Sequence, residues 1–204
     1  MVMNDKFLIF LAAAFLLAVS PGPGMLYVLA RSLKGGRKVG LASSFGTALG
    51  GMGHVIAAAF GLSAILAQSA YAFLFIKYLG AAYLIYLGIR TLASRDAEMP
   101  DAAAEAKGQN PFCQGALTEL LNPKTALFFL AFIPQFVDHT KPLIPQFILL
   151  GAISVALNTS ADWIVVLAAA PLAKRLGTSI LWRRRQRHAS GAALVGLGTY
   201  VALS

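Results

Sequence analysis

Six apolar stretches, each near the length of a membrane span, follow one another along the chain. They cover about residues 7–30, 40–67, 72–92, 113–137, 143–171 and 189–204, the last being short for a span. A hydrocarbon core of about 30 Å requires roughly 20 apolar residues in a helix. None of the stretches alternates apolar and polar residues as a barrel strand does, so we expect helices. The pattern predicts an all-α membrane protein with six transmembrane helices.

Two short sequences interrupt the first and fourth of these spans. Each places a proline beside small or polar residues about a dozen residues into its span, and then the apolar run resumes. The interrupting residues are Ser20, Pro21, Gly22, Pro23 and Gly24 in the first span, and Asn122, Pro123 and Lys124 in the fourth. Proline removes a backbone donor and clashes with the preceding turn, and glycine permits conformations that a side chain forbids. We therefore expect both helices to be broken.

The polar segment 93–111 divides the chain into two sets of three spans, residues 1–92 and 112–204. We interpret this segment as a cytoplasmic linker loop. Because three is odd, the two sets must enter the membrane from opposite faces. Matched breaks in oppositely inserted halves are typical of transporters built as a 3+3 inverted repeat, which bind their substrate near the membrane midplane.

Breaks of this kind leave backbone N–H and C=O groups without hydrogen-bond partners, and lipid cannot supply such partners. They are tolerated only inside protein or beside a water-filled cavity. Main-chain carbonyls and helix ends would suit a zwitterionic ligand, so the two breaks are the candidate substrate site. The alternative is that each break is a packing kink without a ligand.

Polar side chains inside the spans add candidate chemistry. In the fifth span, Ser154, Asn158 and Asp162 recur every fourth residue and share one helix face. Asn158 is a further candidate for substrate binding. Asp162 and Glu119 are rival candidates for carrying a coupled proton, because a carboxyl in the membrane is costly and faces the bundle interior. The alternative for Asp162 is a structural hydrogen bond to a neighbouring helix.

Three basic side chains within or at the edges of spans have alternative interpretations. His54 follows a row of small residues suited to close helix packing, so it is either a packing residue or a third proton-coupling group. Lys124 could pair with one of the acids or bind a substrate carboxylate. Lys77 is expected to extend to the outer membrane surface.

Charge and composition fix the orientation of the chain and exclude several functions. Only 12% of the residues are charged, against about a quarter in soluble domains. Most of the 17 basic residues lie in alternate loops, which places those loops in the cytoplasm and both termini outside. The net charge of +9 is thus a topology signal. The cluster at 183–187 is expected to contact anionic lipid headgroups, not nucleic acid.

No motif for a phosphate loop, a zinc protease, a paired-cysteine site or a serine nucleophile occurs in the sequence. We therefore expect no cofactor, no bound metal and no enzymatic activity. The first span begins like a secretory signal peptide. However, its apolar run resumes at Met25, so we expect an uncleaved span.

Nearly the whole chain resembles the LysE/Rht superfamily of bacterial amino-acid exporters. The resemblance rests on "SPGPGMLYVLARSLKGGRKVGLASSFGTALG", "KYLGAAYLIYLGIRTL" and "LLNPKTALFFLAFIPQFV". It implies a six-span carrier of the plasma membrane, dimeric, that expels amino acids or close derivatives at the expense of the proton gradient. In two places the chain departs from the family. Many members carry an acid where this chain has Gly51, and asparagine where it has Glu119.

The sequence thus predicts a secondary transporter of the bacterial inner membrane. It would export amino acids by proton antiport, with alternating access around the two breaks, and its partners would be the substrate, protons, lipids and a second copy of the chain. The alternatives are a channel, a membrane assembly protein that transports nothing, or a membrane enzyme in which Glu119 and His54 share one pocket.

Overall fold

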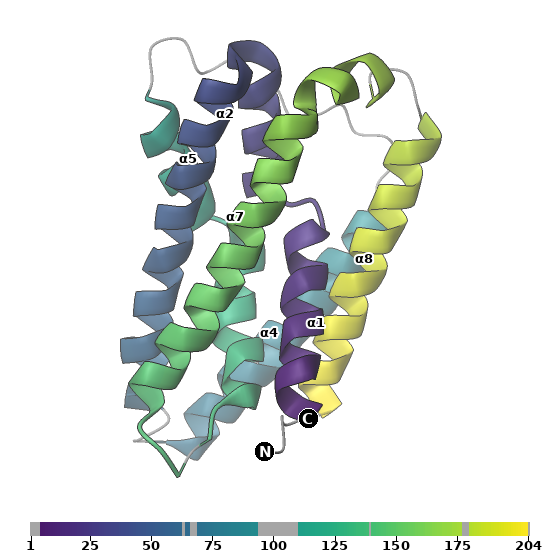
Figure 1. Ribbon diagram of the computed structural model, residues 1–204. Helices are drawn as coiled ribbons and strands as arrows, with labels where there is room; N and C mark the ends of the chain where they lie inside the picture. Colours follow the sequence, from purple (N-terminus) through teal and green to yellow (C-terminus); the bar gives the residue numbers. More distant parts are fainter. Residues whose placement is uncertain are drawn as a thin grey trace.

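The computed structural model describes residues 5–62, 64–65, 69–93, 110–138, 140–176 and 180–203, and every regular element in these ranges is helical. The helices lie side by side in one bundle (Figure 1). The α-helices are α1 (Asp5–Val19), α2 (Pro23–Ala57), α4 (Ala70–Ala93), α5 (Pro111–Leu120), α6 (Pro123–Leu127), α7 (Leu143–Leu176) and α8 (Ile180–Leu203). Two π-helices, Ala58–Leu62 and Phe128–Phe132, and one 3₁₀-helix, Ile133–Phe136, extend α2 and α6. The expected all-helical class is confirmed.

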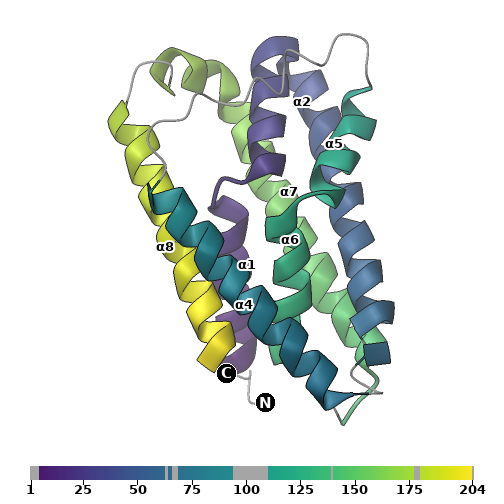
Figure 2. The same ribbon diagram turned by 180° about the vertical axis from the view of Figure 1, so that it is seen from behind.

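The chain turns back within α2, at Gly36. This residue has φ of 74° and ψ of −174°, a conformation that glycine adopts at little cost. Figures 1 and 2 show the turn at the top of the bundle, where the dark part of α2 leads into its long descending part. We expected an irregular basic loop here. Instead, helix continues up to and after the single non-helical residue.

Two helices in the described ranges, Pro23–Leu62 and Leu143–Ala169, are long and apolar enough to cross a membrane. A third span is formed if Pro111–Leu120 and Pro123–Phe136, which are bent by 46° at their junction, cross as one. The apolar helices Lys6–Val19 and Leu194–Leu203 are shorter. The six-span inverted repeat therefore stays a prediction. Of the expected linker at 93–111, residues 94–109 lie outside the described residues, while Ala93 ends α4 and Pro111 begins α5.

Both predicted breaks are present in the backbone. Residues 20–22 separate α1 from α2, and residues 121–122 separate α5 from α6. The second break begins a chain of unusual helix, because α6 passes into a π-helix and then a 3₁₀-helix. Such π segments frequently occur at functional sites.

Small residues allow the long helices to approach closely. A Cβ added to Gly46 or Gly50 would overlap the backbone of α5, and one added to Gly115 would overlap the backbone of α2. The small-residue row in α2 is therefore a packing face within the fold, against α5.

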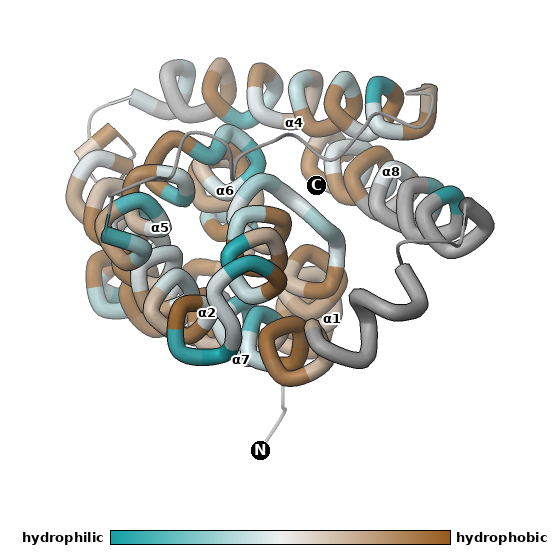
Figure 3. The backbone as a smooth tube through the Cα atoms, turned by 90° about the horizontal axis from the view of Figure 1, so that it is seen from above, coloured by the Kyte–Doolittle hydropathy of each residue, from teal (hydrophilic) through white to brown (hydrophobic). Residues whose placement is uncertain are grey.

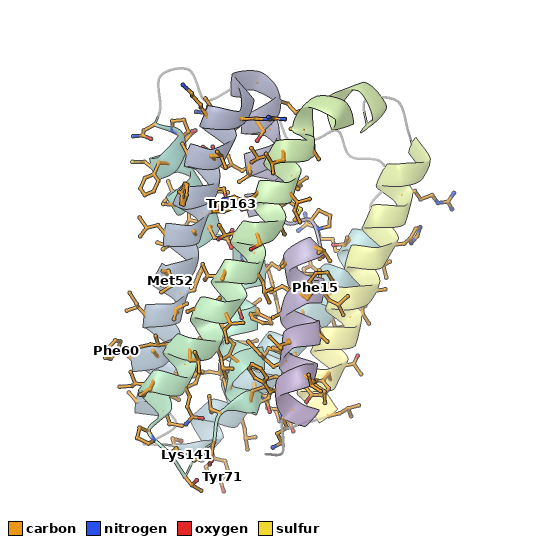
Figure 4. The ribbon with its side chains drawn as sticks, viewed as in Figure 1. Phe15, Met52, Phe60, Tyr71, Lys141 and Trp163 are labelled. Atoms are coloured by element: carbon orange, nitrogen blue, oxygen red, sulfur yellow. The ribbon has the colours of Figure 1, made fainter. Side chains whose placement is uncertain are left out.

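Large apolar side chains cover much of the outside. Phe15, Phe60 and Trp163 are between 41% and 59% exposed, and Phe60 projects away from the bundle in Figure 4. Figure 3 shows hydrophobic residues around the outer faces of the helices. An apolar exterior of this extent suits a bundle surrounded by lipid.

The expectation for Lys77 was wrong. Its side chain is 6% exposed, and its ammonium lies 5.6 Å from the centroid of the Tyr78 ring. Gly80, one turn further along α4, packs directly against Ala131. Lys77 therefore lies on the face of α4 that packs onto the π-helix after α6, and not on the face toward lipid.

Candidate functional site

The two helix breaks meet through Lys124. Its ammonium donates hydrogen bonds to the main-chain carbonyls of Leu17, at 3.0 Å, and of Ser20. Pro21 has no N–H for the Leu17 carbonyl four residues earlier, so the proline leaves this acceptor free. A cation is also favoured at the negative end of a helix. Lys124, 8% exposed, therefore caps α1 across the bundle.

Glu119 occupies the other end of the first break. Its carboxylate accepts hydrogen bonds from the Thr125 hydroxyl at 2.6 Å and from the Asn122 amide nitrogen at 3.1 Å. A Cβ on Gly24 would overlap Oε2 of Glu119, so a side chain at this position would displace the carboxylate. The carboxylate thus lies against the first turn of α2, whose N-terminus favours negative charge.

Asn122 and Pro123 restart the fourth span. The Asn122 side-chain oxygen accepts a hydrogen bond from the Lys124 backbone N–H at 3.1 Å, and Pro123 follows at the first helical position. This is the ordinary N-terminal signal of an α-helix. The Asn-Pro pair therefore has a structural role, and the Asn122 amide joins the new helix to Glu119.

His54 closes the end of α5. Its Nε2 lies 3.0 Å from the main-chain oxygen of Glu119, and its ring stacks on Phe129 with centroids 6.1 Å apart. The imidazole thus satisfies a carbonyl near the second break. The Glu119 carboxylate has its own partners, so the described contacts do not join the two side chains as the enzyme hypothesis requires.

Asp162 is fully buried on α7. Its Oδ2 lies 3.0 Å from the Thr47 hydroxyl on α2, while its Oδ1 has no hydrogen-bond partner among the described residues. The Thr47 hydroxyl also lies 2.8 Å from the main-chain oxygen of Ser44. A hydroxyl carries a single hydrogen and can donate to only one of these oxygens.

A cavity of about 20 Å³ connects several predicted residues. This volume holds about one water molecule. Its polar lining is Thr47, Glu119, Thr125, Ser154 and Asn158. Asp162 is not part of the lining and contacts it through Thr47. Sequence reasoning missed both threonines, for which the only signal was a hydroxyl within an apolar span.

Gly51 lines the same cavity as Glu119. The family resemblance of the sequence implied an acid at the first of these positions and asparagine at the second. The carboxylate in this cavity comes from Glu119 on α5.

A larger hollow of about 440 Å³ lies between α1 and α8. Its lining is apolar except at Ser20 and Tyr200. Ser20 is 6% exposed, and its hydroxyl has no hydrogen-bond partner among the described residues. The first break thus has an apolar space beside it. In the part of the chain that the structure describes, no group of three or more His, Cys, Asp or Glu could hold a metal ion.

The chain matches the model of the LysE type translocator family over residues 15–204. An uncharacterized membrane protein of Bacillus subtilis is 31% identical over 97% of this chain and 98% of the relative. A homoserine/homoserine lactone efflux protein of Salmonella typhimurium is 30% identical over 84% of this chain and 82% of the relative. No solved structure matches the chain. The matched region contains both breaks, Glu119 and Asp162, and the chain belongs to the LysE type translocator family of membrane transporters.

Proposed function

We propose that the protein exports amino acids or close derivatives across the bacterial inner membrane by proton antiport. The observation that carries the proposal is the junction of two broken helices, with Lys124 on the end of α1 and Glu119 on the start of α2. The Salmonella relative is named for efflux of homoserine and homoserine lactone, so these compounds are the first substrates to test.

The substrate site lies at the two breaks. The α1 carbonyls suit the ammonium group of an amino acid, and the first turn of α2 suits its carboxylate. Lys124 and Glu119 now occupy these two positions. Because the adjoining cavity holds about one water molecule, substrate must displace these side chains as the bundle opens. Alternating access supplies that opening.

Asp162 carries the coupled proton. When the Thr47 hydroxyl donates to the Ser44 carbonyl, the contact with Asp162 needs a proton on the carboxyl. When Asp162 is ionised, the hydroxyl must turn toward it instead. Glu119 is suited to the ionised form, because both of its oxygens accept hydrogen bonds from neutral donors. His54 acts as a structural partner of the α5 carbonyl.

The six-span topology, with one three-helix repeat before the linker and one after it, agrees with the position of the chain ends. α1 begins and α8 ends at the same end of the bundle, while the turn at Gly36 lies at the other (Figure 1). An even number of crossings requires both ends on one side. The basic residues around Gly36 then face the cytoplasm, and both termini lie outside.

The test is counterflow of labelled homoserine in reconstituted vesicles. A carrier gives saturable counterflow, whereas a channel or an assembly protein gives none. Asp162→Asn should abolish efflux driven by a pH gradient while substrate binding persists. Asp138→Asn, which changes an exposed loop carboxyl, is the matched control. Unchanged coupling in Asp162→Asn would remove Asp162 from the mechanism and leave Glu119 to be tested.

A further inference from the structure

Three oxygen-bearing side chains come together between α2 and α7. Asp162 and Ser44 are both completely buried, and each has a side-chain oxygen without a hydrogen-bond partner among the described residues. Thr47 lies one turn beyond Ser44 and contacts the Asp162 carboxyl at 3.0 Å. Orphaned buried oxygens are uncommon in native proteins and call for an explanation such as a bound ion or water.

The packing of α2 on α7 sets Ser44 level with Asp162. The helices run in opposite directions, and a Cβ on Gly40 would contact Val166 at 3.1 Å. One turn further along α2 and one turn back along α7 are Ser44 and Asp162. Side chains at i and i+4 share a helix face, so the pair Ser44 and Asp162 lies in the same contact between α2 and α7 as the pair Gly40 and Val166. This contact is called the seam below.

The neighbouring positions confirm this register. The rings of Phe45 and Trp163, each the next residue along its helix, pack edge to face with centroids 5.7 Å apart. These rings form the outer edge of the contact, since they are 51% and 41% exposed. The oxygens of positions 44 and 162 are therefore enclosed behind an aromatic pair.

Charge balance shows what the seam lacks. The charged side chains that act on Asp162 are Glu119 and Lys124, which have opposite signs. Their charges offset each other, and the other buried cation among the described residues, Lys77, lies on α4, so an ionised Asp162 leaves a net negative charge at the contact between α2 and α7. A buried charge without a counter-ion is very costly. The seam thus requires a proton or a small cation.

We propose that this seam, made by Ser44, Thr47 and Asp162, is a sodium-binding site. Na⁺ is a hard cation that takes oxygen ligands, and carboxylate, hydroxyl and main-chain oxygens are all present here. The ligands would be the Asp162 carboxylate, the two hydroxyls and the Ser44 carbonyl. A water in the 20 Å³ cavity, which Thr47 also lines, completes the set.

Sodium occupies the position that a proton takes at the same carboxyl. It releases the Thr47 hydroxyl from donating to Asp162, because the cation then neutralises the carboxylate. The inference concerns the acid to which the proposed function assigns the coupled proton. It adds Na⁺ as a second ion for that position and does not depend on which substrate is carried.

The experiment is equilibrium binding of radioactive Na⁺ to the purified protein in detergent, with choline as the replacement cation. Saturable binding of one ion per chain is expected. Ser44→Ala should weaken it about tenfold, as the loss of one ligand to a charged group would. Asp162→Asn should abolish it. Ser43→Ala is the matched control, because its hydroxyl is also buried on α2, outside the cavity lining, and already donates to the Val39 carbonyl.

Absence of saturable binding would overturn the inference, as would binding that persists in Asp162→Asn. If Asp162→Asn fails to fold, the Na⁺ affinity of Ser44→Ala tests the site instead, since this variant keeps the Asp162 carboxyl. Equal Na⁺ affinity in Ser44→Ala and Ser43→Ala would overturn the assignment of the site. Homoserine counterflow by the same preparation tests the proposed function separately, because it can persist when Na⁺ binding fails.

Discussion

Replacing Lys124 by Met tests whether the ammonium holds the two broken helices together. The substitution keeps most of the side-chain length and removes the charge. It takes away both donors to the α1 carbonyls and leaves the Leu17 carbonyl without the partner that Pro21 cannot supply. It also removes the positive charge that acts electrostatically on the Glu119 carboxylate.

The size of the effect follows from these contacts. A hydrogen bond to a charged group contributes about 1.5–3 kcal/mol. The two bonds share one ammonium, so their contributions are not added. We therefore expect Lys124→Met to lower the free energy of unfolding by about 1.5–3 kcal/mol.

The assay is reversible unfolding in mixed micelles, followed by circular dichroism. Lys141→Met is the matched control, because Lys141 pairs with Asp138 at 3.3 Å on the surface, where its side chain is 71% exposed. Exposed pairs contribute little. The double variant Lys124→Met with Glu119→Gln should be more stable than Lys124→Met alone, since it contains no uncompensated Glu119 charge.

The reasoning is refuted if Lys124→Met unfolds with the same free energy as Lys141→Met. It is also refuted if the loss of unfolding free energy in the double variant equals the sum of the losses measured separately in Lys124→Met and in Glu119→Gln. Such additivity would mean that Lys124 and Glu119 act independently, and the junction of the breaks would then have another cause.

Two further predictions concern single positions. Gly24→Ala should slow counterflow strongly, because the new Cβ displaces the Glu119 carboxylate, whereas Gly61→Ala, where a Cβ meets nothing within 4 Å, should leave the rate unchanged. The Thr140 hydroxyl and amide, with Lys141, lower the pKa of Asp138 to about 2. The loop is therefore stabilised above about pH 4 and loses this contribution as the pH falls toward 2. Thermal unfolding across this range should show a pH dependence that Asp138→Asn removes; an unchanged profile contradicts it.

Local sequence patterns are enough to predict most of the helices and both of their breaks. Apolar runs of span length specify helices because lipid leaves the backbone no other partner. Pro21 and Pro123 break them through local geometry, which acts within one turn. The turn at Gly36 was harder to predict from the sequence, since the neighbouring residues continue the helix and the chain reverses at this one glycine.

Which side chains contact one another depends on how the helices pack. Lys124 and Ser20, which form a hydrogen bond, are 104 positions apart in the sequence, and Thr47 and Asp162 are 115 positions apart. No periodic pattern in the sequence indicates either of these contacts. Such contacts depend on the register of helices packed through small residues, which a local pattern does not contain. The sequence therefore identified the acids and the breaks, while packing assigned their partners.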